Sequence, residues 1–213
     1  MNEYMGITVS EKNGIVYVTA PDQYTLCDLF MRLQEFYESP IASVRGTYFT
    51  EETFRDGYAK QFKKFDYHTT WAGFNVPGNK VKKFYRLFND LSVKELFLKH
   101  KLKKYCNARK KFYVIGTIEK ENEGTLDHEI AHARYYLDSE YKAKQDLIVH
   151  SMPPALMNYL VEALIQMKYD RSVAYDEIQA YLGTTLDFRY LSKNFRVKEM
   201  SWLKNKWIHL RTL

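Results

Sequence analysis

Alternating β-branched and polar residues near the start of the chain predict a β-hairpin. Residues 7–9 and 15–18 consist of Ile, Val, Thr and Tyr, and the Asn13-Gly14 pair between them is typical of a tight hairpin turn. The segment 20–22, Ala-Pro-Asp, interrupts this pattern. Apolar residues then recur at helical spacing from Thr25 to about Tyr37, which predicts an amphipathic helix.

Helical patterns dominate the rest of the chain, with one strong strand among them. Residues 45–80 are less regular, whereas 111–118 form the clearest strand pattern in the sequence. Ser92 and the Glu95 that follows three residues later fit a capping box, and Gly183 is expected to end the last helix. The predicted helices cover 80–90, 92–104, 125–144, 154–168 and 173–182.

Length and composition favour a single α+β domain over 1–213. The chain has 213 residues, of which 46% are apolar, with 9 Gly and 5 Pro, which excludes collagenous and disordered classes. We find neither an apolar stretch long enough to span a bilayer nor a secretion signal, so we expect a soluble cytoplasmic protein without membrane association. Cys27 and Cys106 lack CxxC spacing and are expected to be buried free thiols.

The formal net charge of +6 is the sum of larger positive and negative charges carried by different segments of the chain. Residues 59–111 carry +12, residues 119–187 carry −7 and residues 188–213 carry +6. A basic block, an acidic block and a basic tail are therefore separate regions of the chain.

The candidate chemistry lies in the acidic block, where residues 128–132 read His-Glu-Ile-Ala-His. Side chains four residues apart project from one face of a helix, so His128 and His132 can share one zinc ion. In this HExxH arrangement the neighbouring carboxylate, Glu129, can take a proton from a zinc-bound water. The predicted helix has a separate apolar stripe, and the histidines are not needed for it: Leu126, Ile130, Ala133 and Leu137.

A third protein ligand is expected on a later helix. Glu177 lies three residues before Ala180, whose small side chain would let the two helices approach closely. With these motifs, residues 110–185 resemble the gluzincin group of zinc metallopeptidases, and in detail the small minimal gluzincins. The resemblance implies a zincin-like fold, with a small sheet packed on the HExxH helix and a helical C-terminal part. It also implies His128, His132 and Glu177 as zinc ligands, Glu129 as general base, and a peptide or protein substrate.

Alternatives remain for the third ligand and for the neighbouring groups. His150, Asp176 and Glu162 are other candidates for the third ligand. In thermolysin-like gluzincins, an Asp four residues after the ligand Glu hydrogen-bonds a zinc-binding imidazole, and this chain has Tyr181 there. The oxyanion could be stabilised by any of three tyrosines, among which the sequence does not select: Tyr175, Tyr181 and Tyr190. Packing or surface roles are expected for the other histidines, His68, His100 and His209.

The catalytic core would then cover 111–187, between an N-terminal accessory part, 1–110, and the basic tail, 188–213. The strand at 112–118 is either an internal strand or an edge of the cleft that an extended peptide could join.

The basic block supports a second class of function. Its lysines alternate with aromatic residues, a composition that can bind phosphates and stack nucleic-acid bases. We favour the plainer interpretation, in which Phe84, Leu87, Phe88 and Leu91 pack inward and the lysines face solvent. The main prediction is therefore a zinc-dependent hydrolase, most simply a metallopeptidase. The alternative is a catalytically degenerate zinc-binding module that binds nucleic acid or an acidic partner through residues 80–111.

Overall fold

The computed structural model describes residues 6–71, 73–119 and 124–184. Its fold is α+β, and the chain divides into two compact units, Met1–Asn122 and Glu123–Leu213. The range 111–187, which we expected to form one catalytic core within a single domain, is shared between the units, because the strand at its start pairs with strands of the first unit. The predicted basic tail, 188–213, lies outside the described residues.

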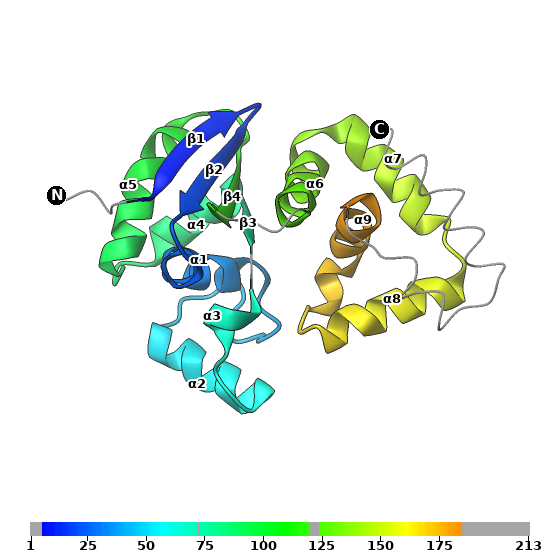
Figure 1. Ribbon diagram of the computed structural model, residues 1–213, viewed down its shortest axis with the longest axis horizontal. Coiled ribbons are helices and arrows are strands. Elements are labelled where there is room, and N and C mark those ends of the chain that lie inside the picture. The colour runs from blue at the N-terminus through cyan, green and yellow to red at the C-terminus, as the bar shows by residue number, and fades with distance from the viewer. Residues whose placement is uncertain (1–5, 72, 120–123, 185–213) are drawn as a thin grey trace. The chain divides into compact units, whose positions relative to one another are not determined.

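The first unit contains a four-stranded mixed sheet with the order β1-β2-β4-β3 (Figure 1). β1 and β2 form the predicted hairpin, with Asn13 and Gly14 at positive φ values of 55° and 81° in its turn. β4 pairs in parallel with β2 and antiparallel with β3, so it is an internal strand. Of the two alternatives for the strand at 112–118, the internal strand is the one observed, because β4 pairs with β2 along its whole length and with β3 from Tyr113 to Gly116. The strands are β1 (Thr8–Lys12), β2 (Ile15–Ala20), β3 (Phe74–Pro77) and β4 (Tyr113–Ile118).

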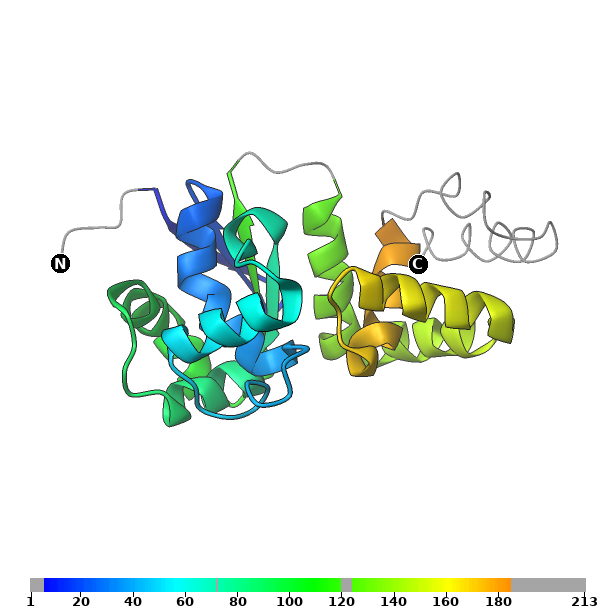
Figure 2. The same ribbon diagram turned by 90° about the horizontal axis from the view of Figure 1, so that it is seen from below.

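Helix α1 packs against strands β2, β3 and β4 of this sheet (Figure 2). Close contact is possible because β4 has Gly116 where the Phe30 ring approaches, and a Cβ there would lie 2.7 Å from Phe30 Cε2. α1 begins after Asp22, whose carboxylate accepts the backbone N–H of Thr25. The helices of this unit are α1 (Gln23–Glu38), α2 (Glu51–Phe62), α3 (Tyr67–Thr70), α4 (Gly78–Leu87) and α5 (Val93–Asn107).

The described part of the second unit, 124–184, is helical, and within it α9 packs against α6, α7 and α8 (Figure 1). Apolar residues of α8 and α9 form its core, including Leu156, Leu160, Ile178 and Leu182. In the described part of the chain, no helix is both long and apolar enough to cross a membrane. The elements are α6 (Thr125–Leu137), α7 (Ser139–His150), α8 (Pro154–Gln166), the 3-10 helix η1 (Arg171–Val173) and α9 (Ala174–Thr184).

Two predicted helix boundaries in this unit are wrong. The helix expected at 125–144 is divided at Asp138, whose carboxylate accepts the backbone N–H groups of Glu140 and Tyr141 and so begins α7. Gly183 does not end α9, which continues to Thr184. Pro154 begins α8 as predicted.

Candidate metal centre

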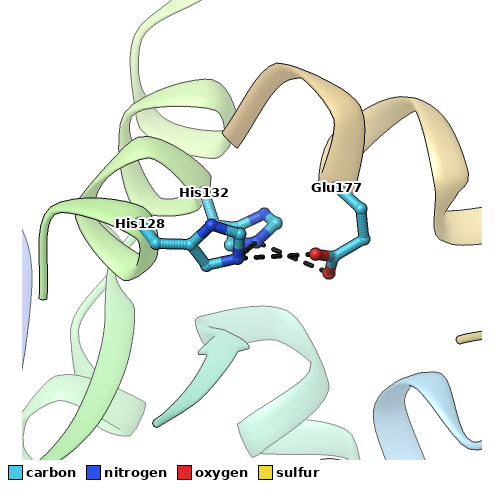
Figure 3. A group of neighbouring side chains, drawn as sticks. All are labelled: His128, His132 and Glu177. Carbon is cyan, nitrogen blue, oxygen red and sulfur yellow. Dashed lines mark hydrogen bonds and ion pairs between the residues drawn. The ribbon is translucent and has the colours of Figure 1, made fainter. Parts of the chain in front are cut away.

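Helices α6 and α9 bring together the three residues that the sequence suggested as ligands (Figure 3). His128 and His132 are four residues apart on α6, so their rings project from one face of the helix. Glu177 lies in the first turn of α9, where the positive end of the helix dipole favours a carboxylate. Ala180 is fully buried, and α6 packs against α9, as the small side chain led us to expect. All three candidate ligands belong to the second unit.

The donor atoms of these residues converge at short distances. His128 Nε2 lies 3.1 Å from His132 Nε2, and Glu177 places Oε2 at 3.4 Å from His128 Nε2 and Oε1 at 3.5 Å from His132 Nε2. Two ligand atoms bound tetrahedrally to one zinc ion, at about 2.0–2.1 Å each, lie about 3.3–3.4 Å apart. The observed separations are close to that value, so this buried His-His-Glu group could hold a metal ion.

Burial and charge at the group also favour a cation. Glu177 and His132 are each only 2% exposed. Burial works against the charged form of Glu177, but the two imidazoles outweigh it and lower the pKa of this carboxyl to about 2. Burial likewise opposes protonation of His132, yet the carboxylates of Asp176 and Glu177 raise its pKa well above the ordinary value. The carboxylate is thus charged in a nearly dry site, where a protonated imidazole or, in place of that proton, a bound metal ion balances its charge.

Asp176 supplies a second carboxylate next to a candidate ligand. Its Oδ1 lies 2.9 Å from His132 Nδ1, on the opposite side of the ring from Nε2. A carboxylate at this position commonly orients a metal-binding imidazole. The resemblance to gluzincins places such a partner four residues after Glu177, where this chain has Tyr181, and the sequence offers Asp176 only as a direct ligand. The structure gives this contact to the residue that precedes Glu177.

Tyr181 instead packs on the other imidazole. Its ring centroid lies 4.4 Å from that of His128, and its hydroxyl is 3.2 Å from the hydroxyl of Tyr169. Burial raises the pKa of both phenols, and the negative charges of Glu177 and Glu129 raise it further. Glu129, the candidate general base, is itself buried and follows His128 in α6.

The other sequence candidates do not belong to this group. His150 is exposed at the end of α7, where it approaches the carbonyl oxygen of Asp146 and stacks on the exposed Tyr175. Glu162 is exposed and pairs with Arg171. His68 is paired with Asp28 in the first unit, and His100 is exposed on α5. Tyr190 and His209 lie outside the described residues.

The predicted apolar stripe of α6 is less buried than the histidine face. Leu126, Ile130 and Leu137 are only partly buried, whereas Ala133 and both histidines are buried. The face that carries the candidate ligands is therefore the better buried one. Cys27 is buried and Cys106 partly buried, and both are free thiols.

The basic block is organised largely as we favoured. Phe84 and Phe88 are fully buried, but Leu87 is exposed, contrary to expectation. Several lysines lie over aromatic rings of the same region and cover ring faces that a nucleic-acid base would need for stacking. These pairs, with ammonium-to-centroid distances of 4.7–5.7 Å, are Lys82 with Phe112, Lys99 with Tyr85, Lys101 with Phe97 and Lys104 with Tyr105.

Comparisons of the chain with protein-family models, with curated proteins and with solved structures found no match.

Proposed function

We propose that this protein is a zinc-dependent hydrolase, most simply a metallopeptidase, with zinc held by His128, His132 and Glu177. The observation that carries the proposal is the convergence of two imidazole nitrogens and a buried carboxylate at 3.1–3.5 Å. Two imidazoles and one carboxylate are a donor set of catalytic zinc sites, which leave one position for water or substrate. The zincin-like fold is part of the proposal, and the packing of α6 against α9 supports it.

The chain's own residues have distinct roles in this proposal. A bound zinc ion would supply a Lewis acid that polarises a carbonyl and lowers the pKa of a water molecule. Glu129 follows the first ligand on α6 and would accept and return the proton of the attacking water. Tyr181 and Tyr169 keep their protons, because burial and nearby carboxylates raise their pKa values. Their hydroxyls can therefore act only as neutral groups.

Metal content tests the ligand set first. We expect the purified protein to contain one zinc ion per chain by plasma emission spectrometry, and His132→Ala to lose it because one of three ligands is removed. His150→Ala is the matched control, since this exposed histidine lies in the same unit but outside the group. Wild-type protein without zinc, or His132→Ala with full zinc content, would refute the ligand set.

Hydrolysis tests the general base. Glu129→Gln should retain zinc, because the ligands are unchanged, while hydrolysis of a quenched fluorescent peptide library falls by about 100-fold or more. The variant must be compared with wild type at equal zinc content. Wild-type activity in Glu129→Gln would remove this residue from the mechanism, and zinc-loaded wild type that cleaves no peptide would exclude the peptidase assignment.

A further inference from the structure

We propose that one face of the first unit, formed by α4, α5 and the loop after α5, binds the phosphate backbone of a nucleic-acid duplex without base-specific contacts. This inference does not depend on the candidate metal centre, which belongs to the second unit. We call this surface the basic face. It is formed by six cationic residues: Lys82, Arg86, Lys99, Lys103, Arg109 and Lys110.

Contacts between the two helices make the basic face one continuous surface. α4 packs against α5. Lys82 Nζ on α4 donates a hydrogen bond, at 2.9 Å, to the carbonyl oxygen of Ala108, the residue that directly follows α5. The ammonium group of Lys99 on α5 lies 5.7 Å from the ring centroid of Tyr85 on α4. These two lysines therefore connect the helices and the loop that contains the last two members of the face.

Helical spacing and exposure make the charges accessible. Arg86 lies four residues after Lys82, and Lys103 lies four residues after Lys99, so each pair projects from one side of its helix. Lys82 and Lys99 are partly buried, and the other four members of the basic face are exposed. A partner can consequently approach cations on both helices and on the loop.

The acidic residues of this region are engaged elsewhere. Residues 78–111 contain 12 Lys and Arg but only two acidic residues, Asp90 and Glu95. Both carboxylates pair with Arg32 of α1, at 3.0 Å and 2.5 Å respectively. Within residues 6–71, 73–119 and 124–184, none of the six cations of the basic face forms an ion pair with a carboxylate. Their charge is therefore available to an anionic partner.

The aromatic rings of this region favour a duplex over a single strand as that partner. Stacking of unpaired bases requires an accessible ring face, but Lys99 lies over Tyr85 and Lys82 lies over Phe112, each at 5.7 Å from the ring centroid. An ammonium group has three N–H donors, so it can contact a ring and still donate to a phosphate. In a duplex the bases stack in the interior and the phosphates lie outside, where cations reach them without sequence preference.

An anionic membrane is another polyanionic surface, and the positions of the apolar residues argue against it. Helices that lie in a membrane interface insert apolar side chains between the headgroups. The exposed large apolar side chains of α5, Val93 and Leu96, are near its start, whereas Lys99 and Lys103 lie in its later turns. The cationic part of the face therefore lacks the exposed apolar side chains that would enter a bilayer.

The salt dependence of duplex binding tests the proposal. The logarithm of the association constant falls linearly with the logarithm of the salt concentration, with a slope of about −0.9 for each phosphate that a cation neutralises. We expect fluorescence anisotropy to give equal dissociation constants for two DNA duplexes of unrelated sequence, because no base is contacted. Residues 188–213 are also basic, so the change in slope caused by each variant is the quantity to compare.

Two pairs of substitutions remove charge from different parts of the basic face. Lys99→Gln combined with Lys103→Gln should make the slope shallower by about 2 and weaken binding of both duplexes equally, because two phosphate contacts are lost. Arg109→Gln combined with Lys110→Gln should have the same effect through the loop. Circular dichroism should show that both variants remain folded, since all four positions are at the surface.

The matched control removes the same amount of positive charge from the second unit. Lys142→Gln combined with Lys144→Gln should bind both duplexes with the wild-type slope. These two lysines are exposed like the members of the basic face, but Asp146 lies 2.7 Å from Lys142 Nζ and Glu140 lies 2.9 Å from Lys144 Nζ. Their charge is thus already neutralised within the protein.

Competition experiments identify the class of partner. Unlabelled duplex should displace the labelled duplex at lower concentration than single-stranded DNA of equal length or vesicles that contain phosphatidylserine. Stronger competition by the single strand or the vesicles, no duplex binding at 50 mM salt, or wild-type slopes in both basic-face variants would overturn the inference. His132→Ala should bind duplex like wild type, so failure of the zinc site and failure of the basic face are separate results.

Discussion

A single buried carboxyl group in the core of the first unit, that of Glu35, destabilises the folded state when it ionises. Glu35 is 5% exposed in α1, and burial raises the pKa of its side chain to about 7 from the ordinary 4.5, with the nearby Ser39 and Tyr67 offsetting only part of the rise. Because the folded state favours the neutral acid, the stability associated with Glu35 is complete below pH 4.5 and is lost as the pH rises to about 7. At higher pH the cost is about 3 kcal/mol.

Glu35→Gln should remove this pH dependence. The variant is expected to gain stability relative to wild type between pH 5 and pH 8, by up to about 3 kcal/mol, because its side chain cannot ionise. Urea unfolding of both proteins at several pH values measures the difference in their free energies of unfolding. Groups that titrate in the same way in both proteins do not contribute to this difference. Glu52→Gln, at an exposed position of α2, should follow wild type. A constant difference between Glu35→Gln and wild type across the pH range would contradict the prediction.

The identity and spacing of residues were sufficient to select the candidate ligands but not the residues that surround them in the structure. Spacing four residues apart on a helix places His128 and His132 on one face whatever the tertiary structure, and Glu177 stood out with Ala180 on a later helix. Asp176 could not be assigned in the same way. Successive residues of a helix point about 100° apart, so only the packing of α9 decides which acidic side chain faces the metal group and which faces His132 Nδ1.

At the scale of elements, Asp138 separates two helices that share one hydrophobic pattern. Its carboxylate accepts two backbone N–H groups at the start of α7, at 2.9 and 3.0 Å. Asp138→Ala should reduce the free energy of unfolding of the second unit by about 1 kcal/mol, the usual cost of losing such a cap. Chemical denaturation measures the loss, and Asp138→Asn or Asp138→Ser should restore most of it. An unchanged midpoint for Asp138→Ala would mean that the cap does not contribute.

Elements with a local signal were predictable, and those defined by packing were not. The hairpin turn at Asn13-Gly14 and the capping box of Ser92 and Glu95 are confirmed, because each depends on residues close in sequence. The irregular region at 45–80 contains α2, α3 and β3, which the sequence did not indicate. β3 is four residues long and fully buried, so it lacks the alternation that reveals a half-buried strand. The break at Asp138 was missed because apolar positions continue at helical spacing through Leu137 and Tyr141.

At the scale of the whole molecule, the candidate ligands all belong to one of the two units. His128 and His132 are on α6 and Glu177 is on α9, so zinc would bridge two helices of the second unit. A ligand that binds only the folded state stabilises it by about 2.7 kcal/mol at a free concentration 100 times its dissociation constant. That corresponds to an equilibrium constant for opening that is about 100-fold smaller for the structure that contains the site.

Hydrogen exchange followed by mass spectrometry can locate this stabilisation along the chain. We expect zinc to slow exchange in peptides from α6 and α9, while peptides from β2 and β4 exchange at the same rate with and without zinc. His132→Ala should exchange like the zinc-free protein in both units, because it lacks one ligand. Equal protection of both units in the wild type would show that opening of the first unit is coupled to the metal site. Protection that persists in His132→Ala would show that zinc acts through other residues, since the two remaining donors on α6 and α9 are too few for a stable zinc site.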